Sequence, residues 1–297
     1  MPAIAPLRAI RYNQDKIADL SQVVSPPYDI ISKEELAYYS HLSPYNIVHL
    51  TIPRSQKKDN HVYSKAAKRF RDWLKNKILI QEEIPVIYFY EQRFIIAKKE
   101  YNRLGFIANL NLRNKAIFGH EHTRIEPVED RFRLQERLKA NLEPIFVLFS
   151  DPGNCLGKIF KRIIASSNPV SIVTDRQKIE NYLWRVSSPS LIKQVVNLMN
   201  KKDFFIADGH HRYEVALAYR HKMLETLKTP AKVNRAFNYI LAYFCPVKSK
   251  GLLVNSSIHL KEILRLAKSG KKLPPKSTYF YPKVLSGLVI YKFENPS

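Results

Sequence analysis

The segment DGHHR at residues 208 to 212 carries side chains that could bind a phosphate group. The apolar residues 204 to 207 before it predict a short buried strand, and a helical pattern begins directly after it. Asp208 is a favourable helix N-cap, and Gly209 permits a positive φ. The amides that open a helix favour an anion, and the forked cation of Arg212 suits phosphate oxygens. The segment therefore predicts a phosphate-binding turn, although Asp-Gly also joins strands to helices without a ligand.

A second polar cluster, GHEHTR at residues 119 to 124, is expected in a loop between strands. Glu121 lies between His120 and His122, and a carboxylate flanked by imidazoles could act as a general base. Arg124 follows closely and could contact a substrate or a phosphate. The alternative is an exposed polar loop without a chemical role.

The same histidines raise the alternative of a transition-metal site. His120 and His122 alternate as on a strand, and Asp208, His210 and His211 could complete a ligand set. No HExxH motif or cysteine ligand pair supports this alternative, so the sequence assigns no transition-metal ligand. Asp208 is expected to cap the helix or to help hold Mg²⁺.

Two further clusters could contact the substrate or a phosphate. Tyr28 and Asp29 follow two prolines, which could equally be only a rigid turn before a helix. Lys276, Ser277 and Thr278 offer an ammonium and two hydroxyls, although an ordinary strand entry explains them too. No nucleophile elbow, Walker A or GxGxxG motif occurs, which disfavours hydrolase-elbow, P-loop and Rossmann sites.

The elements that must position these clusters alternate between helical and strand patterns. Ser32 and Glu35 form a capping box for one helix, and residues 85–94 and 103–112 predict an antiparallel hairpin around a polar interruption at 98–102. Other predicted helices are 61–77, 133–140, 156–165, a helix from Pro189, one from Tyr213 and 260–267; other predicted strands are 145–149, 170–173, 181–186, 236–247, 251–254 and 287–293. The order predicts the α+β class, a mixed or antiparallel sheet with surrounding helices. We expect one domain, 1–297, with a candidate N-terminal subdomain at 1–80.

The composition is that of a folded protein, since 45% of the 297 residues are hydrophobic and 11% are aromatic. The net charge of +23 favours anionic substrates, but the cations are spread along the chain, and Lys65 to Lys77 reads as a solvated amphipathic helix. Nucleic-acid binding is therefore not the expected main function. No apolar run has the length of a membrane span or of a signal-peptide core. Cys155 and Cys245 are isolated, and we expect both to be reduced core residues of a cytoplasmic protein.

Five motifs in order resemble the signatures of one uncharacterised archaeal and bacterial family, domain of unknown function 1015. They are SPPYDIIS, GHEHT, ANLEPIFVLFSDP, FIADGHHRYEVALAYR and PPKSTYFYPK. The resemblance covers nearly the whole chain. The DGHHR turn is in addition similar to the phosphate-binding turn of the ParB/sulfiredoxin superfamily, which includes ADP-dependent free-serine kinases. This resemblance implies a ParB/sulfiredoxin-like core at about residues 105–245. It also implies a nucleoside phosphate, ATP, ADP or CTP, with Mg²⁺.

The resemblance assigns roles to the polar clusters. His120 and Glu121 match a catalytic pair, Asp208, Gly209 and Arg212 match the phosphate site, and the two histidines at 210 and 211 fill its variable positions. A cytoplasmic, free-serine-kinase-like phosphotransferase is the leading hypothesis, with Glu121 as the base, and with the helix amides, Arg212 and His211 on the phosphoryl group. The alternatives are a nucleotide-sensing or nucleic-acid-associated binding protein without turnover, and a phosphomonoester hydrolase.

Overall fold

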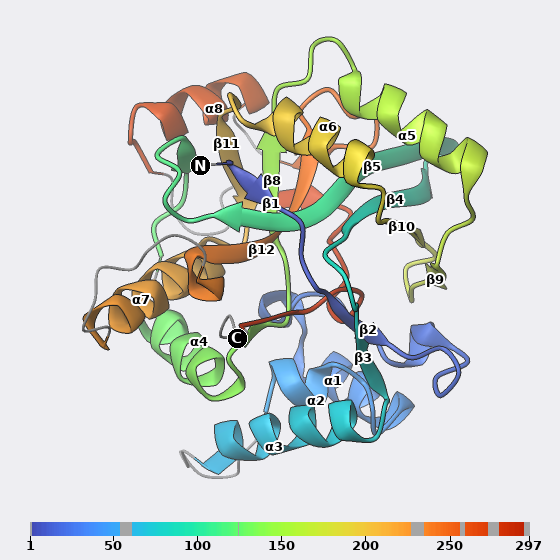
Figure 1. The fold of residues 1–297 in the computed structure, drawn as a ribbon, viewed down its shortest axis with the longest axis vertical. Coiled ribbons are helices and arrows are strands. Elements are labelled where there is room, and N and C mark those ends of the chain that lie inside the picture. The colour runs from blue at the N-terminus through green and yellow to red at the C-terminus, as the bar shows by residue number, and fades with distance from the viewer. Residues whose placement is uncertain are drawn as a thin grey trace.

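The computed structural model describes residues 2–53, 61–123, 125–226, 235–255, 259–272 and 279–293. It confirms a mixed α+β architecture with helices around a mixed sheet (Figure 1). Arg124, Lys276, Ser277 and Thr278 lie outside the described residues, so their expected roles stay predictions.

The described residues build a nine-stranded sheet that runs through the middle of the molecule. Two of its neighbouring pairs, β6 with β11 and β8 with β12, are parallel, and the other pairs are antiparallel. In spatial order the strands are β6 (Ile117–Gly119), β11 (Phe204–Asp208), β8 (Ile145–Phe149), β12 (Tyr239–Pro246), β5 (Lys99–Asn111), β4 (Ile87–Ile96), β10 (Glu180–Val186) and β9 (Ser171–Thr174), with β1 (Ile4–Ala5) beside β5. Shorter strands pair outside this sheet: β2 (Ile10–Tyr12) with β3 (Leu79–Gln81), β7 (Ala140–Asn141) with β15 (Tyr291–Lys292), and β13 (Leu253–Asn255) with β14 (Tyr279–Tyr281).

The predicted hairpin is confirmed as β4 and β5, which pair antiparallel from Tyr88 with Ile107 to Ile96 with Lys99. Its polar interruption is shorter than expected. Ala97 and Lys98 alone turn the chain, with φ of 49° and 61°. Two successive left-handed residues match the twist of a tight hairpin, so the polar residues after them can continue the strand.

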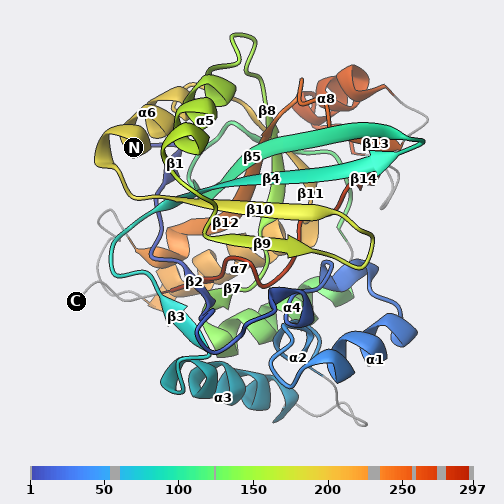
Figure 2. The same cartoon turned by 90° about the vertical axis from the view of Figure 1, so that its right-hand side faces the viewer.

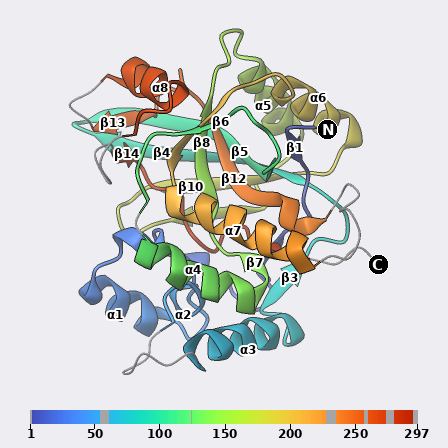
Figure 3. The ribbon, with the colours of Figure 1, turned by 90° about the vertical axis from the view of Figure 1, so that its left-hand side faces the viewer.

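The helices cover the sheet from two sides. α5 (Cys155–Ser166) and α6 (Pro189–Met199) lie together on one side and pack Leu156, Phe160 and Val195 against the sheet (Figures 1 and 2). On the other side α4 (Ile125–Leu138) and α7 (His210–Thr226) pack against each other (Figure 3). The remaining helices are α1 (Lys33–Leu42), α2 (Val48–Thr51) and α3 (His61–Lys75), grouped at one end of the molecule, and α8 (Leu260–Lys268) at the other.

Local sequence signals explain several helix ends. The capping box is confirmed, because Ser32 Oγ accepts from the Glu35 amide at 3.2 Å and Glu35 Oε2 accepts from the Ser32 amide at 3.0 Å. The predicted start of α4 at residue 133 is wrong, since the helix begins at Ile125. Pro127 does not prevent this earlier start, because amides in the first turn have no acceptor inside the helix.

The prediction that both cysteines belong to the core is half wrong. Cys245 is buried, but Cys155 is exposed because it occupies the first position of α5, where the apolar stripe of the helix has not yet met the sheet. Among the described residues, no helix combines the length and the apolar character needed to cross a bilayer.

Candidate functional site

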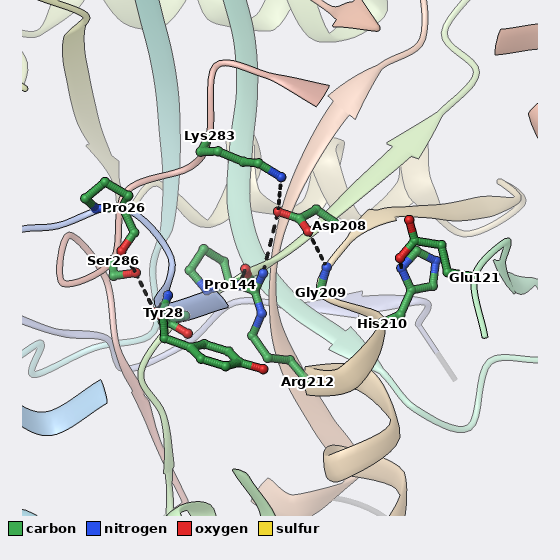
Figure 4. Close-up of polar contacts among 11 residues, drawn as sticks. Pro26, Tyr28, Glu121, Pro144, Asp208, Gly209, His210, Arg212, Lys283 and Ser286 are labelled. Carbon is green, nitrogen blue, oxygen red and sulfur yellow. Dashed lines mark hydrogen bonds and ion pairs between the residues drawn. The ribbon is translucent and has the colours of Figure 1, made fainter. Parts of the chain in front are cut away.

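Parallel pairing of two strands brings the two polar loops of the sequence together. β6 pairs with β11 so that Ile117 lies beside Phe204 and Gly119 lies beside Ile206. Because parallel neighbours leave the sheet at the same edge, the chain after Gly119 emerges next to the chain after Asp208. Glu121 therefore lies at the start of α7 (Figure 4).

Three side chains form what we call the base group: His120, Glu121 and His210. The His120 amide donates to His210 Nε2 at 3.2 Å, which makes that nitrogen an acceptor and leaves the proton of the neutral imidazole on Nδ1. His210 Nδ1 lies 3.4 Å from Glu121 Oε2, and His120 Nε2 lies 3.9 Å from Glu121 Oε1. The two imidazole rings meet edge to face with their centroids 4.7 Å apart. The carboxylate thus lies beside two buried imidazoles, of which His210 is the nearer.

Burial keeps both of these histidines neutral. His120 is 3% exposed, and burial lowers its pKa to about 4, while His210 is 6% exposed and its pKa falls well below the ordinary value, again mainly through burial. A neutral His210 can still donate its Nδ1 proton to the carboxylate. His120 Nε2, in contrast, is buried without a hydrogen-bond partner among the described residues.

Gly209 sets the turn between β11 and α7. Its φ is +88°, and its carbonyl accepts the first helical hydrogen bond, from the Tyr213 amide at 3.0 Å, so Gly209 is the N-cap. The prediction that Asp208 caps the helix is wrong, because Asp208 is the last residue of β11 and its Oδ1 accepts from the Gly209 amide at 3.0 Å. A Cβ at position 209 would lie 2.9 Å from Arg212 Nε, so only glycine fits there.

Arg212 turns its guanidinium into the protein. Nη1 donates to the Pro144 carbonyl, Nη2 lies 3.7 Å from Asp208 Oδ2, and Nε is covered without a hydrogen-bond partner among the described residues. Burial alone would lower the pKa of Arg212, but Asp208, Glu143 and Asp29 surround it and raise the pKa instead. A phosphate in direct contact with this guanidinium, as the sequence predicts, would compete with Asp208 and the Pro144 carbonyl.

Asp208 is placed between two cations. Lys283 Nζ donates to Asp208 Oδ2 at 3.0 Å, opposite the guanidinium of Arg212 (Figure 4). Burial alone would raise the pKa of Asp208, yet the charges of Lys283 and Arg212 hold it below its ordinary value. The carboxylate is therefore ionised and already balanced by protein cations.

Glu143 completes this second set, which we call the arginine group: Asp208, Arg212, Glu143, Lys283 and Tyr28. Glu143 Oε1 accepts from the Tyr28 amide at 3.0 Å and from the hydroxyl of Ser286 at 2.7 Å. Burial raises the pKa of Glu143, and the charge of Arg212 opposes that shift. The ring of Tyr28 lies under the guanidinium of Arg131, 4.4 Å from its carbon. Four segments that are far apart in the sequence thus meet around Arg212.

Sequence reasoning found some of these residues and missed others. Tyr28 lies in the arginine group, and Asp29 lies close enough to affect the pKa of Arg212, while their contacts with a substrate stay predictions. His122 is exposed, and His211 is half-buried in the first turn of α7. Glu143, Lys283 and Ser286 were missed. An acid directly before the apolar run PIFVLF was the available signal for Glu143.

The described residues do not favour a metal ion held by the protein. Among them, no group of three or more His, Cys, Asp or Glu side chains has the arrangement of a metal site. Asp208, the expected Mg²⁺ ligand, already faces Lys283 and Arg212. A divalent cation bound there would have to displace both, so Asp208 does not fit the role of a metal ligand.

Comparison with known proteins agrees with the motifs. A family model described as "Protein of unknown function (DUF1015)" matches residues 4–259. The chain belongs to this family. The matched range includes the base group, Tyr28, Glu143 and Arg212, but it ends before Lys283 and Ser286. No curated protein and no solved structure matches the sequence.

Proposed function

We propose that the protein is a nucleotide-dependent phosphotransferase that acts on a small hydroxylated substrate such as free serine. The observation that carries the proposal is the position of Glu121, whose Oε2 lies 3.4 Å from His210 Nδ1 in the first turn of α7. A carboxylate thus stands beside the end of a 17-residue helix that attracts anions.

The chemistry follows from this arrangement. The first amides of α7 have no acceptor within the helix and could bind oxygens of the transferring phosphoryl group. Glu121 accepts the proton of the substrate hydroxyl as its oxygen bonds to phosphorus, while the bond from phosphorus to the leaving nucleotide oxygen breaks. Phosphoryl transfer depends mainly on positioning and charge stabilisation, which a fixed carboxylate and fixed amides supply. His210 acts as a positioning residue, because its Nδ1 proton orients the carboxylate.

The arginine group has a supporting role in this proposal. Arg212, through Asp208 and Pro144, holds the β11–α7 turn in the conformation that presents the helix amides. The nucleotide, ATP, ADP or CTP, is a substrate, and Mg²⁺ would arrive on its phosphates rather than on a protein carboxylate. The similarity of the DGHHR turn to ParB/sulfiredoxin proteins supports the choice of a nucleotide.

Substitution of Glu121 tests the proposal. The protein is incubated with ATP, ADP or CTP, Mg²⁺ and free serine, and phosphoserine is followed by phosphorus NMR. Glu121→Gln keeps the size of the side chain and is expected to lower turnover at least about 100-fold while nucleotide affinity by calorimetry stays unchanged. The matched control is Glu126→Gln, an exposed acid in the first turn of α4. Wild-type turnover in Glu121→Gln would refute Glu121 as the base.

A binding protein without turnover is the second candidate, favoured by the net charge of +23. Such a protein would bind nucleotide or nucleic acid equally well with Glu121→Gln and would form no phosphoserine. Release of inorganic phosphate from a phosphomonoester, without serine as acceptor, would instead identify the hydrolase.

A further inference from the structure

The helix α8 is fixed to the edge of the sheet next to the base group. Its Lys268 forms an ion pair with Asp203, just before β11. The Lys268 ammonium also lies 6.0 Å from the ring centroid of Phe118 in β6 and 5.7 Å from that of Phe205 in β11. Since each contact ties α8 to one of the two parallel strands, the residues after α8 have a defined position relative to the site.

A glycine ends α8 and redirects the chain. Gly270 has a φ of +76°, its amide donates to the Ala267 carbonyl at 3.2 Å, and the Lys271 amide donates back to the Leu266 carbonyl at 3.1 Å. This left-handed ending satisfies the last helical carbonyls and reverses the chain. It delivers Lys272 to β6, where Nζ donates to the Gly119 carbonyl at 2.6 Å.

The ammonium of Lys272 lies against the base group. A Cβ built on Gly119 would be 3.2 Å from Lys272 Nζ and 3.1 Å from His210 Cδ2, so the cation and the imidazole edge meet over this glycine. The charge of Lys272 also helps to lower the pKa values of His120 and His210, after the larger effect of burial. Lys272 is exposed, and no carboxylate in the described part of the chain lies within 4 Å of its ammonium.

We infer that Lys272 is an anion-binding residue of this site, where it contacts the terminal phosphate of a di- or triphosphate ligand. The inference rests on the proposed function. In it Lys272 supplies the positive charge for the phosphate, because the guanidinium of Arg212 is turned into the protein. An ammonium has three protons, and the Gly119 carbonyl uses one. The buried, unpartnered Nε2 of His120 beside Glu121 is a second polar group at this site that lacks a protein partner among the described residues.

Calorimetric titrations with ATP, inorganic pyrophosphate and adenosine test the inference. Lys272→Met removes the charge and keeps a long, unbranched side chain. Lys271→Met, at the exposed neighbouring lysine, is the matched control. We expect Lys272→Met to weaken ATP and pyrophosphate binding at least about tenfold, as for a lost charge-assisted hydrogen bond, and to leave adenosine binding unchanged. Lys272→Arg should restore part of the affinity, and the thermal midpoints of all variants should agree.

The outcomes separate this inference from the proposed function. If Lys272→Met binds ATP and pyrophosphate as tightly as wild type does, the role of Lys272 is overturned, even if the protein makes phosphoserine. Lys272-dependent binding without phosphoserine would support the role of Lys272 and refute free serine as the acceptor. Wild type that binds none of ATP, ADP, CTP and pyrophosphate would overturn both.

Discussion

Replacement of His120 by Asn tests the electrostatics of the base group. His120 is buried and neutral, and its pKa of about 4 lies below the value of 6.5 for a free histidine. Asparagine retains a donor near the position of Nδ1 but cannot take up a proton. The substitution therefore removes one titrating group from the interior and leaves the other ionisable groups of the site in place.

The sign and size of the effect follow from linkage. Between pH 6.5 and 4 the unfolded chain binds a proton at His120 that the folded protein does not, so the folded state loses stability as the pH falls below about 6.5. Integration between the two pKa values gives a loss of about 2 kcal/mol from pH 7 to pH 5 and about 3 kcal/mol to pH 4. His210, whose pKa is also depressed, adds a loss of the same sign in both proteins.

Urea denaturation at pH 7, 6 and 5 measures the difference. The free energy of unfolding should fall more steeply towards acid in wild type than in His120→Asn, by about 2 kcal/mol at pH 5. His221→Asn, at an exposed histidine of α7, is the matched control and should follow wild type. Parallel profiles for wild type and His120→Asn would show that His120 titrates alike in the folded and unfolded states, which would refute a buried, neutral His120.

Two substitutions test other parts of the interior. Gly209→Ala should cost about 3 kcal/mol in urea denaturation, because its Cβ would displace the guanidinium of Arg212, whereas Gly270→Ala, with a similar φ but nothing within 4 Å, should cost about 1 kcal/mol. Equal losses of stability in Gly209→Ala and Gly270→Ala would mean that the guanidinium of Arg212 moves aside without an energetic cost. Arg103→Met should leave the unfolding midpoint unchanged or raise it, since this fully buried guanidinium donates only to Gln92 among the described residues. A loss of more than about 2 kcal/mol in the free energy of unfolding would instead show that other interactions compensate the buried charge of Arg103.

Most local elements could be predicted because their causes lie within a few residues. The Ser32 capping box, the hairpin on either side of Ala97 and the strand before Gly209 all depend on neighbouring side chains and on backbone conformation. The failures were local too. Asp208 has the right chemistry for an N-cap, but pairing with β8 extends the strand through it and moves the cap to Gly209. Similarly, the stripe that buries α5 leaves Cys155, at its first position, in solvent.

The sequence by itself determined that the two polar loops carry side chains able to do chemistry and that Arg212 lies in the first turn of a helix. Only the tertiary structure decided that Glu121 meets His210, because that contact depends on the parallel pairing of β6 with β11, whose residues are far apart in the chain. It also decided that Arg212 turns inward to Asp208 and Pro144, while Lys272 faces the base group instead. Periodicity and capping specify conformation over a few residues, whereas the choice of partner depends on long-range packing that no local pattern encodes.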